Sequence, residues 1–290
     1  MRNLLLIPAL LVAASAIAAP CPGPREWIDQ NGKPLRAADA LDRAGTAQAL
    51  LLGEEHANAA HHAWQRDVLA TLAARGPLVI GLEQLPRDAQ PALDRWVNGE
   101  TDESQFLAES RWAEHWGHDF AAYRPVFALA RAQRIPMQAL NVDRAFVRKV
   151  GRAGFAAAAS DGRAPISRPA TPDPAYSAKL ETQFRQHMRE ASPEALGHFV
   201  EAQTVWDRAM AEAIVLAMRE RPGARVAAIM GWGHVAFGHG VAHQLKALGV
   251  TDVTTAIPVS AGPSCEPGAG SADLLFGIGD RQARGEKPPR

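Results

Sequence analysis

The sequence predicts an α/β fold with a mostly parallel central sheet flanked by helices, in a single domain that carries an irregular excursion and a helical insertion. Short apolar runs alternate along the chain with segments of helical period, as strands and helices do in such folds. The runs are continuously apolar instead of alternating, which is typical of parallel strands buried on both faces. The 290 residues, 47% of them hydrophobic, are enough for one sizeable core.

Five apolar runs are predicted to be strands because turn signals or acidic residues follow them. They read AQALLLGEE, LVIGLEQ, IPMQALNV, RVAAIMGWG and TDVTTAIPV. In chain order, the predicted strands span residues 47–55, 78–84, 135–142, 225–233 and 251–259.

A helix is predicted over residues 59–75, directly after the first strand. Spacings of three and four place His62, Gln65 and two leucines on one stripe, so we expect His62 and Gln65 at the polar end of an inward face. His61 falls outside this stripe and is expected at the surface. A further helix, after the second strand, is expected to end at Gly99, because glycine favours the C-terminal cap.

The middle of the chain combines helical and irregular patterns. Two helices are expected before the third strand, and Pro125 fits the first turn of the second helix or a kink in it. Residues 153–175 are rich in Ala, Pro, Ser and Gly without a sustained period, which predicts the irregular excursion. Residues 176–223 return to helical character, and we expect two helices broken near Ser192 and Pro193.

The first 18 residues have the features of a secretory signal peptide. Arg2 provides a short positive region, Leu4 to Val12 are apolar, and Ala16 and Ala18 fit the small-residue cleavage pattern. We therefore expect cleavage after Ala18 and export, to the periplasm or out of the cell. The alternative is an uncleaved membrane anchor, since the segment nearly reaches spanning length.

Composition divides the rest of the chain into three parts. Residues 19–38 form an N-terminal segment, and the α/β domain is expected over residues 39–262. Residues 263–290 form a C-terminal segment, which begins rich in Gly, Pro and Ser and is expected to be partly disordered.

The chain has two cysteines, Cys21 and Cys265. Cys21 lies just behind the signal peptide, where bacterial lipoproteins carry their lipid-acceptor cysteine. Pro20 replaces the small residue that normally precedes such a cysteine, so lipid anchoring is disfavoured. In an oxidising compartment two lone thiols more often pair than stay free. The sequence leaves both a Cys21–Cys265 disulfide and lipid attachment open.

Charge and missing motifs exclude several classes of function. Lys and Arg together number 31, as do Asp and Glu, so the net charge of the chain provides no electrostatic attraction to nucleic acid. The sequence contains no H-E-x-x-H, no paired C-x-x-C, no phosphate-binding loop and no G-x-S-x-G elbow. Nucleotide binding of the common kinds and serine or cysteine hydrolysis are therefore poorly supported.

Three predicted strands end in polar residues behind a glycine, in the sequences GEEH, GLEQ and GWGH. In open α/β sheets, ligands bind at the carboxyl ends of the strands. If these strands are neighbours, one rim of the sheet carries Glu54, Glu55, His56, Glu83 and His234.

Each of these residues alone has a plain structural explanation, because an acid or imidazole after a strand often caps the next helix. Three such strand ends together favour a site. The residue types suit a divalent metal, water activation by a glutamate, or the holding of a ligand's carboxylates. The residues by themselves leave these three possibilities open.

Four segments carry a resemblance to a known family: LLGEEHANAAHHAWQRDVL, VIGLEQLPRDAQPALDRWVNG, WGHDFAAYRPVFALARAQRIPMQALNV and IMGWGHVAFGHGVAHQLKALG. In them the chain resembles the ChaN family of haem-binding uptake proteins, which shares a superfamily with the Tiki proteases and the erythromycin-esterase-like enzymes. The resemblance covers most of residues 47–249 in matching order. The positions that fill the family's pattern are Gly53, Glu54, His56, Gln65, Glu83, Trp116, Tyr123, Arg124, Pro125, Gly231, Gly233 and His234.

The resemblance implies an exported haem-binding protein that takes part in haem or iron uptake, and it favours a binding protein over an enzyme. In the family, a homodimer encloses stacked haems, one tyrosine ligates each iron, and His and Lys of the partner hold the propionates. Contact with outer-membrane haem uptake machinery is a further expectation. The two tyrosines here are Tyr123 and Tyr176, and His56, His62 and Lys179 are further candidates for haem contacts.

The wider superfamily supplies a second hypothesis, a metal-dependent or Glu/His-based hydrolase similar to the Tiki proteases or erythromycin esterases. His56, Glu83 and His234 would then hold Mn, Co or Zn, and Glu54 or Glu83 would act as the base. A third hypothesis is an exported binding domain for another ligand.

Overall fold

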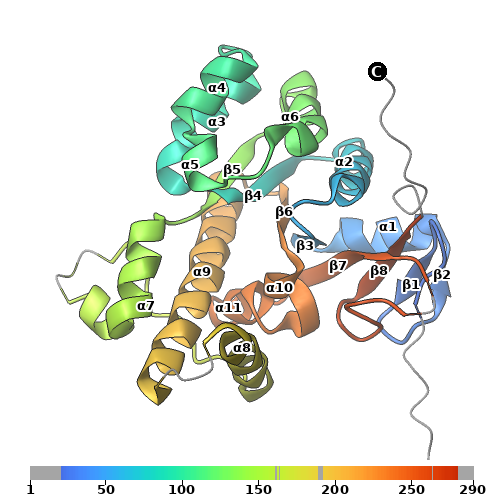
Figure 1. The fold of residues 1–290 in the computed structure, drawn as a ribbon. Helices are drawn as coiled ribbons and strands as arrows, with labels where there is room; N and C mark the ends of the chain where they lie inside the picture. The colour runs from blue at the N-terminus through green and yellow to red at the C-terminus, as the bar shows by residue number, and fades with distance from the viewer. Residues whose placement is uncertain (1–20, 161, 163, 189–191, 263, 280–290) are drawn as a thin grey trace, which may run out of the picture.

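An eight-stranded sheet forms the centre of the computed structural model, which describes residues 21–160, 162, 164–188, 192–262 and 264–279 (Figure 1). The strand order is β2-β1-β8-β7-β3-β6-β4-β5. All neighbours from β8 to β5 pair in parallel, whereas β1 is antiparallel to both β2 and β8. The strands are β1 Trp27–Asp29, β2 Pro34–Leu35, β3 Ala49–Glu54, β4 Leu78–Pro86, β5 Met137–Asn141, β6 Arg225–Gly231, β7 Val253–Ser260 and β8 Leu274–Ile278.

Helices cover both faces of the sheet, which confirms the predicted α/β architecture (Figure 1). Short 3-10 turns at Arg87–Ala89 and Ala236–Gly238 complete the regular structure of the described residues. The helices are α1 Ala37–Thr46, α2 Ala59–Ala73, α3 Gln90–Asn98, α4 Glu103–Glu109, α5 Trp112–His115, α6 Phe120–Gln133, α7 Arg144–Ala158, α8 Pro174–His187, α9 Pro193–Glu220, α10 Trp232–Val235 and α11 Val241–Ala247.

Strand β3 shows how the core divides into two layers. Its successive side chains point to opposite faces of the sheet. Leu50 and Leu52 pack with the core on the side of α2 and α6, and Leu51 packs with the core on the side of α9 and α11. Both faces are buried, as the continuous apolar run predicts.

Strands β3, β6 and β4 are direct neighbours, so the predicted polar strand ends meet at one edge of the sheet. The register pairs Glu54 at the end of β3 with Gly231 at the end of β6. Strand β4 runs on to Pro86, two residues past its predicted end.

Helix α2 confirms the predicted inward stripe but corrects the expectation for His61. His62, Gln65 and Leu69 are completely buried, and His61 is also buried, with only 2% of its surface exposed. The backbone N–H of Glu55 donates to His61 Nδ1 over 3.0 Å. The first turn of α2 thus packs against the turn that leads into it, and burial lowers the pKa of His61 to about 4.

The irregular excursion is shorter than predicted, because α7 continues through Ala158. Gly154, with φ of 77°, breaks the regular helix inside α7. The excursion then lies against α9, where the Arg208 side chain donates to Ser167 Oγ, and against the 3-10 turn after β4, where the Arg87 side chain donates to the Pro165 carbonyl. Helices α8 and α9 confirm the two predicted helices with a break before Pro193.

Three strands were not predicted from the sequence: β1, β2 and β8. Strand β8 extends the parallel sheet beside β7, and β1 and β2 add an antiparallel edge to it. All three strands lie outside the expected domain span of residues 39–262. The predicted signal peptide, residues 1–18, and the RGEKPPR terminus lie outside the described residues. Among the helices that are described, none is long and apolar enough to cross a membrane.

A disulfide joins Cys21 to Cys265. It confirms the pairing that the sequence left open. A thioether-linked lipid at Cys21 would need the same sulfur, so the disulfide and lipid attachment exclude each other.

Candidate functional site

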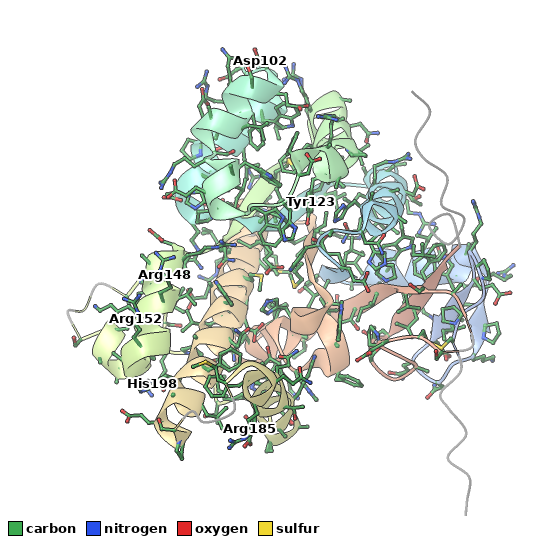
Figure 2. All side chains as sticks on the ribbon, viewed as in Figure 1. Asp102, Tyr123, Arg148, Arg152, Arg185 and His198 are labelled. Carbon is green, nitrogen blue, oxygen red and sulfur yellow. A yellow bond between two sulfur atoms is a disulfide. The ribbon has the colours of Figure 1, made fainter. Side chains whose placement is uncertain are left out.

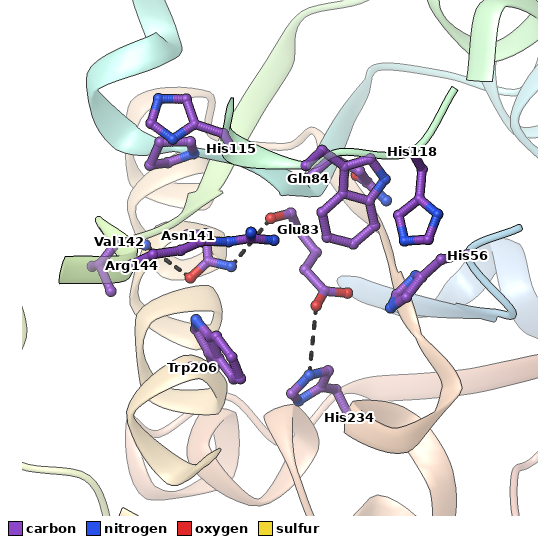
Figure 3. A pocket seen from close by; sticks show the side chains of 12 residues that line it. His56, Glu83, Gln84, His115, His118, Asn141, Val142, Arg144, Trp206 and His234 are labelled. Atoms are coloured by element: carbon purple, nitrogen blue, oxygen red, sulfur yellow. Dashed lines mark hydrogen bonds and ion pairs between the residues drawn. The ribbon is translucent and has the colours of Figure 1, made fainter. Parts of the chain in front are cut away.

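A hollow of about 210 Å³ lies at the carboxyl ends of β4 and β6 and the turn after β3 (Figure 3). Its position is where ligands bind in open α/β sheets. The residues that line it are His56, Glu83, Gln84, Pro86, His115, Trp116, His118, Asn141, Val142, Arg144, Trp206 and His234. Imidazoles and indoles supply half of this lining, Arg144 supplies a guanidinium and Glu83 a carboxylate.

Glu54, the last residue of β3, is a buried carboxylate behind this hollow. Its Oε1 accepts hydrogen bonds from Tyr123 OH at 2.6 Å, from His56 Nδ1 at 3.0 Å and from Gln84 Nε2 at 3.3 Å. His62 Nε2 lies 3.4 Å from the other oxygen, Oε2. The carboxylate therefore joins side chains from β4, α2, α6 and the turn after β3.

The protonation states of this cluster follow from its contacts. Burial alone would raise the pKa of Glu54, but the contacts with His56, His62 and Tyr123 outweigh it and hold that pKa well below its usual range. Burial and the neighbouring Glu54 carboxylate raise the pKa of Tyr123 far above its usual value. Glu54 is thus ionised and Tyr123 protonated at neutral pH.

His56 lies in the turn between β3 and α2 and faces the hollow. Its ring packs edge-on against Trp116, with centroids 4.6 Å apart, and lies 5.6 Å from the ring of His118. Burial disfavours its charged form, but the hydrogen bond to Glu54 and the charge of Glu83 raise the pKa of His56 above its ordinary value.

Glu83 and His234 form the second half of the site (Figure 3). Glu83 Oε2 accepts a hydrogen bond from the Gly231 N–H at 2.6 Å, and Oε1 lies 3.5 Å from His234 Nε2. On its other side, His234 Nδ1 lies 2.7 Å from Asp207 Oδ1. Burial lowers the pKa of His234, but Glu83 and Asp207 outweigh this effect and raise it to about 9.

Asp207, on α9, is a site residue that sequence reasoning missed. It is completely buried, and its Oδ2 accepts a hydrogen bond from Tyr176 OH at 3.0 Å. An acid in the middle of a long helix has no local motif that would distinguish it from a surface acid. Its one indication of an inward position is that it lies four residues before the buried Ala211, on the same face of the helix.

The structure brings together some predicted site residues and separates others. Glu54, His56, Glu83 and His234 meet at one edge of the sheet, whereas Glu55 is exposed. His62 lies beneath the hollow, completely buried, with its ring 4.0 Å from that of Tyr123.

Tyr176 and Lys179 lie on α8, beyond Asp207, and do not line the hollow. Lys179 Nζ lies 4.8 Å from the centre of the Trp232 ring, buried and without a hydrogen-bond partner. Burial lowers the pKa of this amine despite the nearby Asp207 carboxylate.

The sequence missed several lining residues, among them the aromatic and cationic groups Trp206, His115, His118 and Arg144. Trp206 Nε1 is buried without a hydrogen-bond partner among the described residues. His118 follows Trp116 by two residues in the segment WGHDF, the one sequence signal that associates it with the family pattern.

The donor set of the hollow fits haem in part. Tryptophan faces suit a flat porphyrin, imidazoles are common iron ligands, and Arg144 suits a propionate. The two tyrosines fit less well, because Tyr123 OH donates to Glu54 and Tyr176 OH donates to Asp207. Burial and these carboxylates raise both phenol pKa values, which opposes the phenolate form that binds ferric iron.

The alternative metal trio of His56, Glu83 and His234 is not arranged as a metal centre. Within the described part of the chain, no three His, Cys, Asp or Glu side chains are placed to hold a metal ion. The reason is visible at His234, whose nitrogens face Asp207 and Glu83, and at Glu83, where one oxygen holds the Gly231 N–H.

Comparisons with known proteins agree with this architecture. The structure is similar to that of ChaN of Campylobacter jejuni, described as showing cofacial haem binding, with a TM-score of 0.65 and 16% identity over 87% of this chain and 95% of that one. It is also similar to a mutant of the erythromycin esterase EreC in an open conformation, with a TM-score of 0.46 and 10% identity over 82% of this chain and 78% of that one. No curated protein matches the chain in sequence. Residues 40–245 match the family described as haem-binding uptake, Tiki superfamily, ChaN, and the chain therefore belongs to that family.

Proposed function

We propose that this protein is an exported haem-binding protein that takes part in haem or iron uptake, and that haem binds at the hollow beside His56. The observation that carries the proposal is the lining of that hollow, where indole faces, imidazoles and one guanidinium converge within the part of the chain that matches the ChaN family. These groups suit a flat aromatic ligand with an iron centre and anionic edges.

The size of the hollow favours a homodimer with haem between its subunits. Pockets that enclose a drug-sized ligand measure roughly 300–1,000 Å³, and the hollow of this chain is about 210 Å³. A porphyrin would extend out of it and expose an apolar face, which a second copy of the chain would cover. The described cofacial haem binding of Campylobacter jejuni ChaN supports the same arrangement.

Two observations support export. The sequence of residues 1–18 has the pattern of a secretory signal, and the Cys21–Cys265 disulfide suits an oxidising compartment. From the periplasm, the protein would receive haem from outer-membrane uptake machinery.

A hemin titration tests the binding proposal. Mature protein, from residue 19 onward, is titrated into hemin and the absorption spectrum is recorded. We expect a shifted and sharpened Soret band that saturates at one hemin per chain, with a doubling of molar mass by light scattering as hemin is added. A hemin spectrum unchanged by the protein would contradict the proposal.

Arg144 offers a sharper test with a matched control on the same helix. The Arg144→Glu variant places an anion where the propionate would bind, so we expect hemin affinity to fall about tenfold, or ~1.4 kcal/mol. Arg148 lies one helical turn further along α7, is exposed, and does not line the hollow (Figure 2). Arg148→Glu has the same change in charge and should leave affinity unchanged. Equal losses in both variants would place the ligand elsewhere.

A further inference from the structure

We propose that Arg144, Arg148 and Arg152 of α7 form a docking stripe for an acidic segment of a partner protein. The inference goes beyond the proposed function, because the stripe needs no bound haem to attract such a segment. It is supported by the spacing of the three guanidinium groups, by their lack of ion pairs and by their position beside the hollow.

The three arginines of this stripe follow one another at intervals of four residues, so they lie on one face of α7. All three are exposed, and Arg148 and Arg152 lie along the outer side of the helix in Figure 2. Val147 and Val150, on the inward face, are buried in the core shared with α9. Neighbouring arginines are about 6 Å apart along the helix axis, and the stripe spans about 12 Å.

No carboxylate among the described residues forms an ion pair with the arginine stripe. Asp143, the acid closest in sequence, accepts a hydrogen bond from the Ala145 N–H at 2.7 Å. Elsewhere exposed arginines are paired, as Arg36 is with Asp39, Arg95 with Glu109 and Arg124 with Glu103. Helix α7 has four basic residues and no acidic one, although acids and bases balance over the whole chain. The stripe is therefore a local positive charge that the fold leaves unneutralised.

The stability of α7 does not explain this arrangement. Like charges four residues apart repel one another on a helix, and the stripe contains two such pairs. Arg144 is also the first residue of α7, where the positive end of the helix dipole disfavours a cation. Lys149, by contrast, donates to the Ala158 carbonyl at the other end of the helix. The fold thus uses Lys149, whereas the charges of the stripe remain available to a partner.

Charge and spacing together fit an acidic protein segment. Guanidinium groups bind carboxylates through paired hydrogen bonds. Acids at every fourth position of a helix repeat about every 6 Å, and acids at alternate positions of an extended segment about every 6.7 Å. A helix that binds a lipid surface also presents large apolar side chains to it. Among the described residues the large apolar side chains that are exposed are Met188, Leu216 and Phe237, none of which is on α7.

The stripe begins at the hollow, because Arg144 is one of its lining residues (Figure 3). A segment docked on Arg148 and Arg152 would therefore end beside the opening of the hollow. Such a position suits a protein that delivers the ligand of the hollow or receives it.

The test is a nuclear magnetic resonance titration of the isotope-labelled mature protein at low ionic strength with two helical peptides of equal charge. The matched peptide carries three glutamates at intervals of four residues, and the clustered peptide carries the same glutamates side by side. We expect the matched peptide to shift the backbone amide signals of α7, and the clustered peptide to bind more weakly. Phosphatidylglycerol vesicles, added in a parallel sedimentation assay, should not bind.

Two double variants with the same change in net charge locate the binding site. Arg148→Glu/Arg152→Glu should bind the matched peptide at least about tenfold more weakly, because two attractions become repulsions. Arg43→Glu/Arg219→Glu is the control, since both residues are exposed and lie on α1 and α9. It should bind as the wild type does. A charge-swapped peptide with lysines at the matched positions should bind Arg148→Glu/Arg152→Glu and not the wild type, which also shows that this variant is folded.

The outcomes that would overturn the proposal are distinct from those that concern haem. Equal binding of the matched and clustered peptides, or equal losses in the two double variants, would mean that the attraction is unspecific. Vesicle binding that depends on Arg148 and Arg152, without peptide binding, would assign the stripe to a membrane. Hemin titration is scored separately: a protein that binds the matched peptide but leaves the hemin spectrum unchanged keeps the docking stripe and loses the proposed function.

Discussion

At the scale of single residues, Glu54 is the site residue that contacts side chains from the most helices, strands and turns. Its carboxylate accepts hydrogen bonds from three side chains and lies beside His62. A buried ion needs such partners, because transfer of an unpaired charge from water costs several kcal/mol. Each donor therefore contributes to the stability of the fold as well as to the shape of the site.

Tyr123→Phe should lower the free energy of unfolding by about 1–3 kcal/mol, because it leaves a buried carboxylate with one donor fewer and adds no volume. Urea unfolding at pH 7 measures the change. A double-mutant cycle with Glu54→Gln isolates the pair, and we expect a coupling of about 0.5–3 kcal/mol. Additive effects of the two substitutions would show that the hydrogen bond contributes nothing specific.

His234 should make stability decline at alkaline pH. Its pKa is about 9 in the folded protein, above 6.5 in the unfolded chain, because Glu83 and Asp207 outweigh the effect of burial. The contribution is fully present below pH 6.5 and is lost as pH rises through 9, with a magnitude of about 3 kcal/mol. Urea unfolding at a series of pH values should show this decline in the wild type and a flatter profile in His234→Gln. Parallel profiles would contradict the assignment.

Site residues close to strand ends could be predicted from the sequence, and site residues far from strand ends could not. Glu54, His56, Glu83 and His234 were predicted as site residues because each follows a glycine at the end of an apolar run. Asp207 was not predicted, since its role depends on contacts with α8 and α10 that leave no local pattern. The burial of the tyrosine hydroxyls could not be predicted from the sequence either, because their carboxylate partners lie 69 and 31 residues away.

At the scale of elements, the close approach of β6 to the turn after β3 positions His56. A methyl group at Gly231 would lie 2.8 Å from His56 Cε1, while the N–H of residue 231 could still donate to Glu83. A larger side chain at residue 231 would therefore displace the His56 imidazole by steric overlap alone.

Gly231→Ala should lower the free energy of unfolding by about 1–3 kcal/mol and weaken hemin binding, because His56 must move. Gly233→Ala is the matched control, since an added Cβ there meets no atom within 4 Å and alanine favours the helix α10. Urea unfolding and hemin titration of both variants check the prediction. A Gly231→Ala protein that equals Gly233→Ala in both measurements would mean that His56 adapts without cost.

The five parallel strands from β3 to β7 could be predicted because they are apolar and buried. The edge strands could not, because β1 and β2 contain only three and two residues, and β8 follows a segment rich in Gly, Pro and Ser. Their pairing depends on β7 reaching the same edge, a tertiary contact without a local signal. The architecture was therefore predictable from β3 to β7 and not at the edge formed by β8, β1 and β2.

At the scale of the whole molecule, the Cys21–Cys265 disulfide links the segment before β1 to the loop before β8, across 244 residues of sequence. Such a bond restricts the unfolded chain, and it ties together the two ends of the described fold. Disulfides commonly contribute about 2–4 kcal/mol in this way, more for longer loops in the chain-entropy account.

Cys265→Ser should therefore lower the free energy of unfolding by about 2–4 kcal/mol. Cys21→Ser and the double variant should give the same loss, because one missing sulfur already breaks the bond. Urea unfolding with and without dithiothreitol checks this: the reductant should destabilise the wild type to the level of the variants and leave the variants unchanged. Independent losses at the two cysteines, or a wild type insensitive to reductant after full unfolding, would show that the bond does not form in solution.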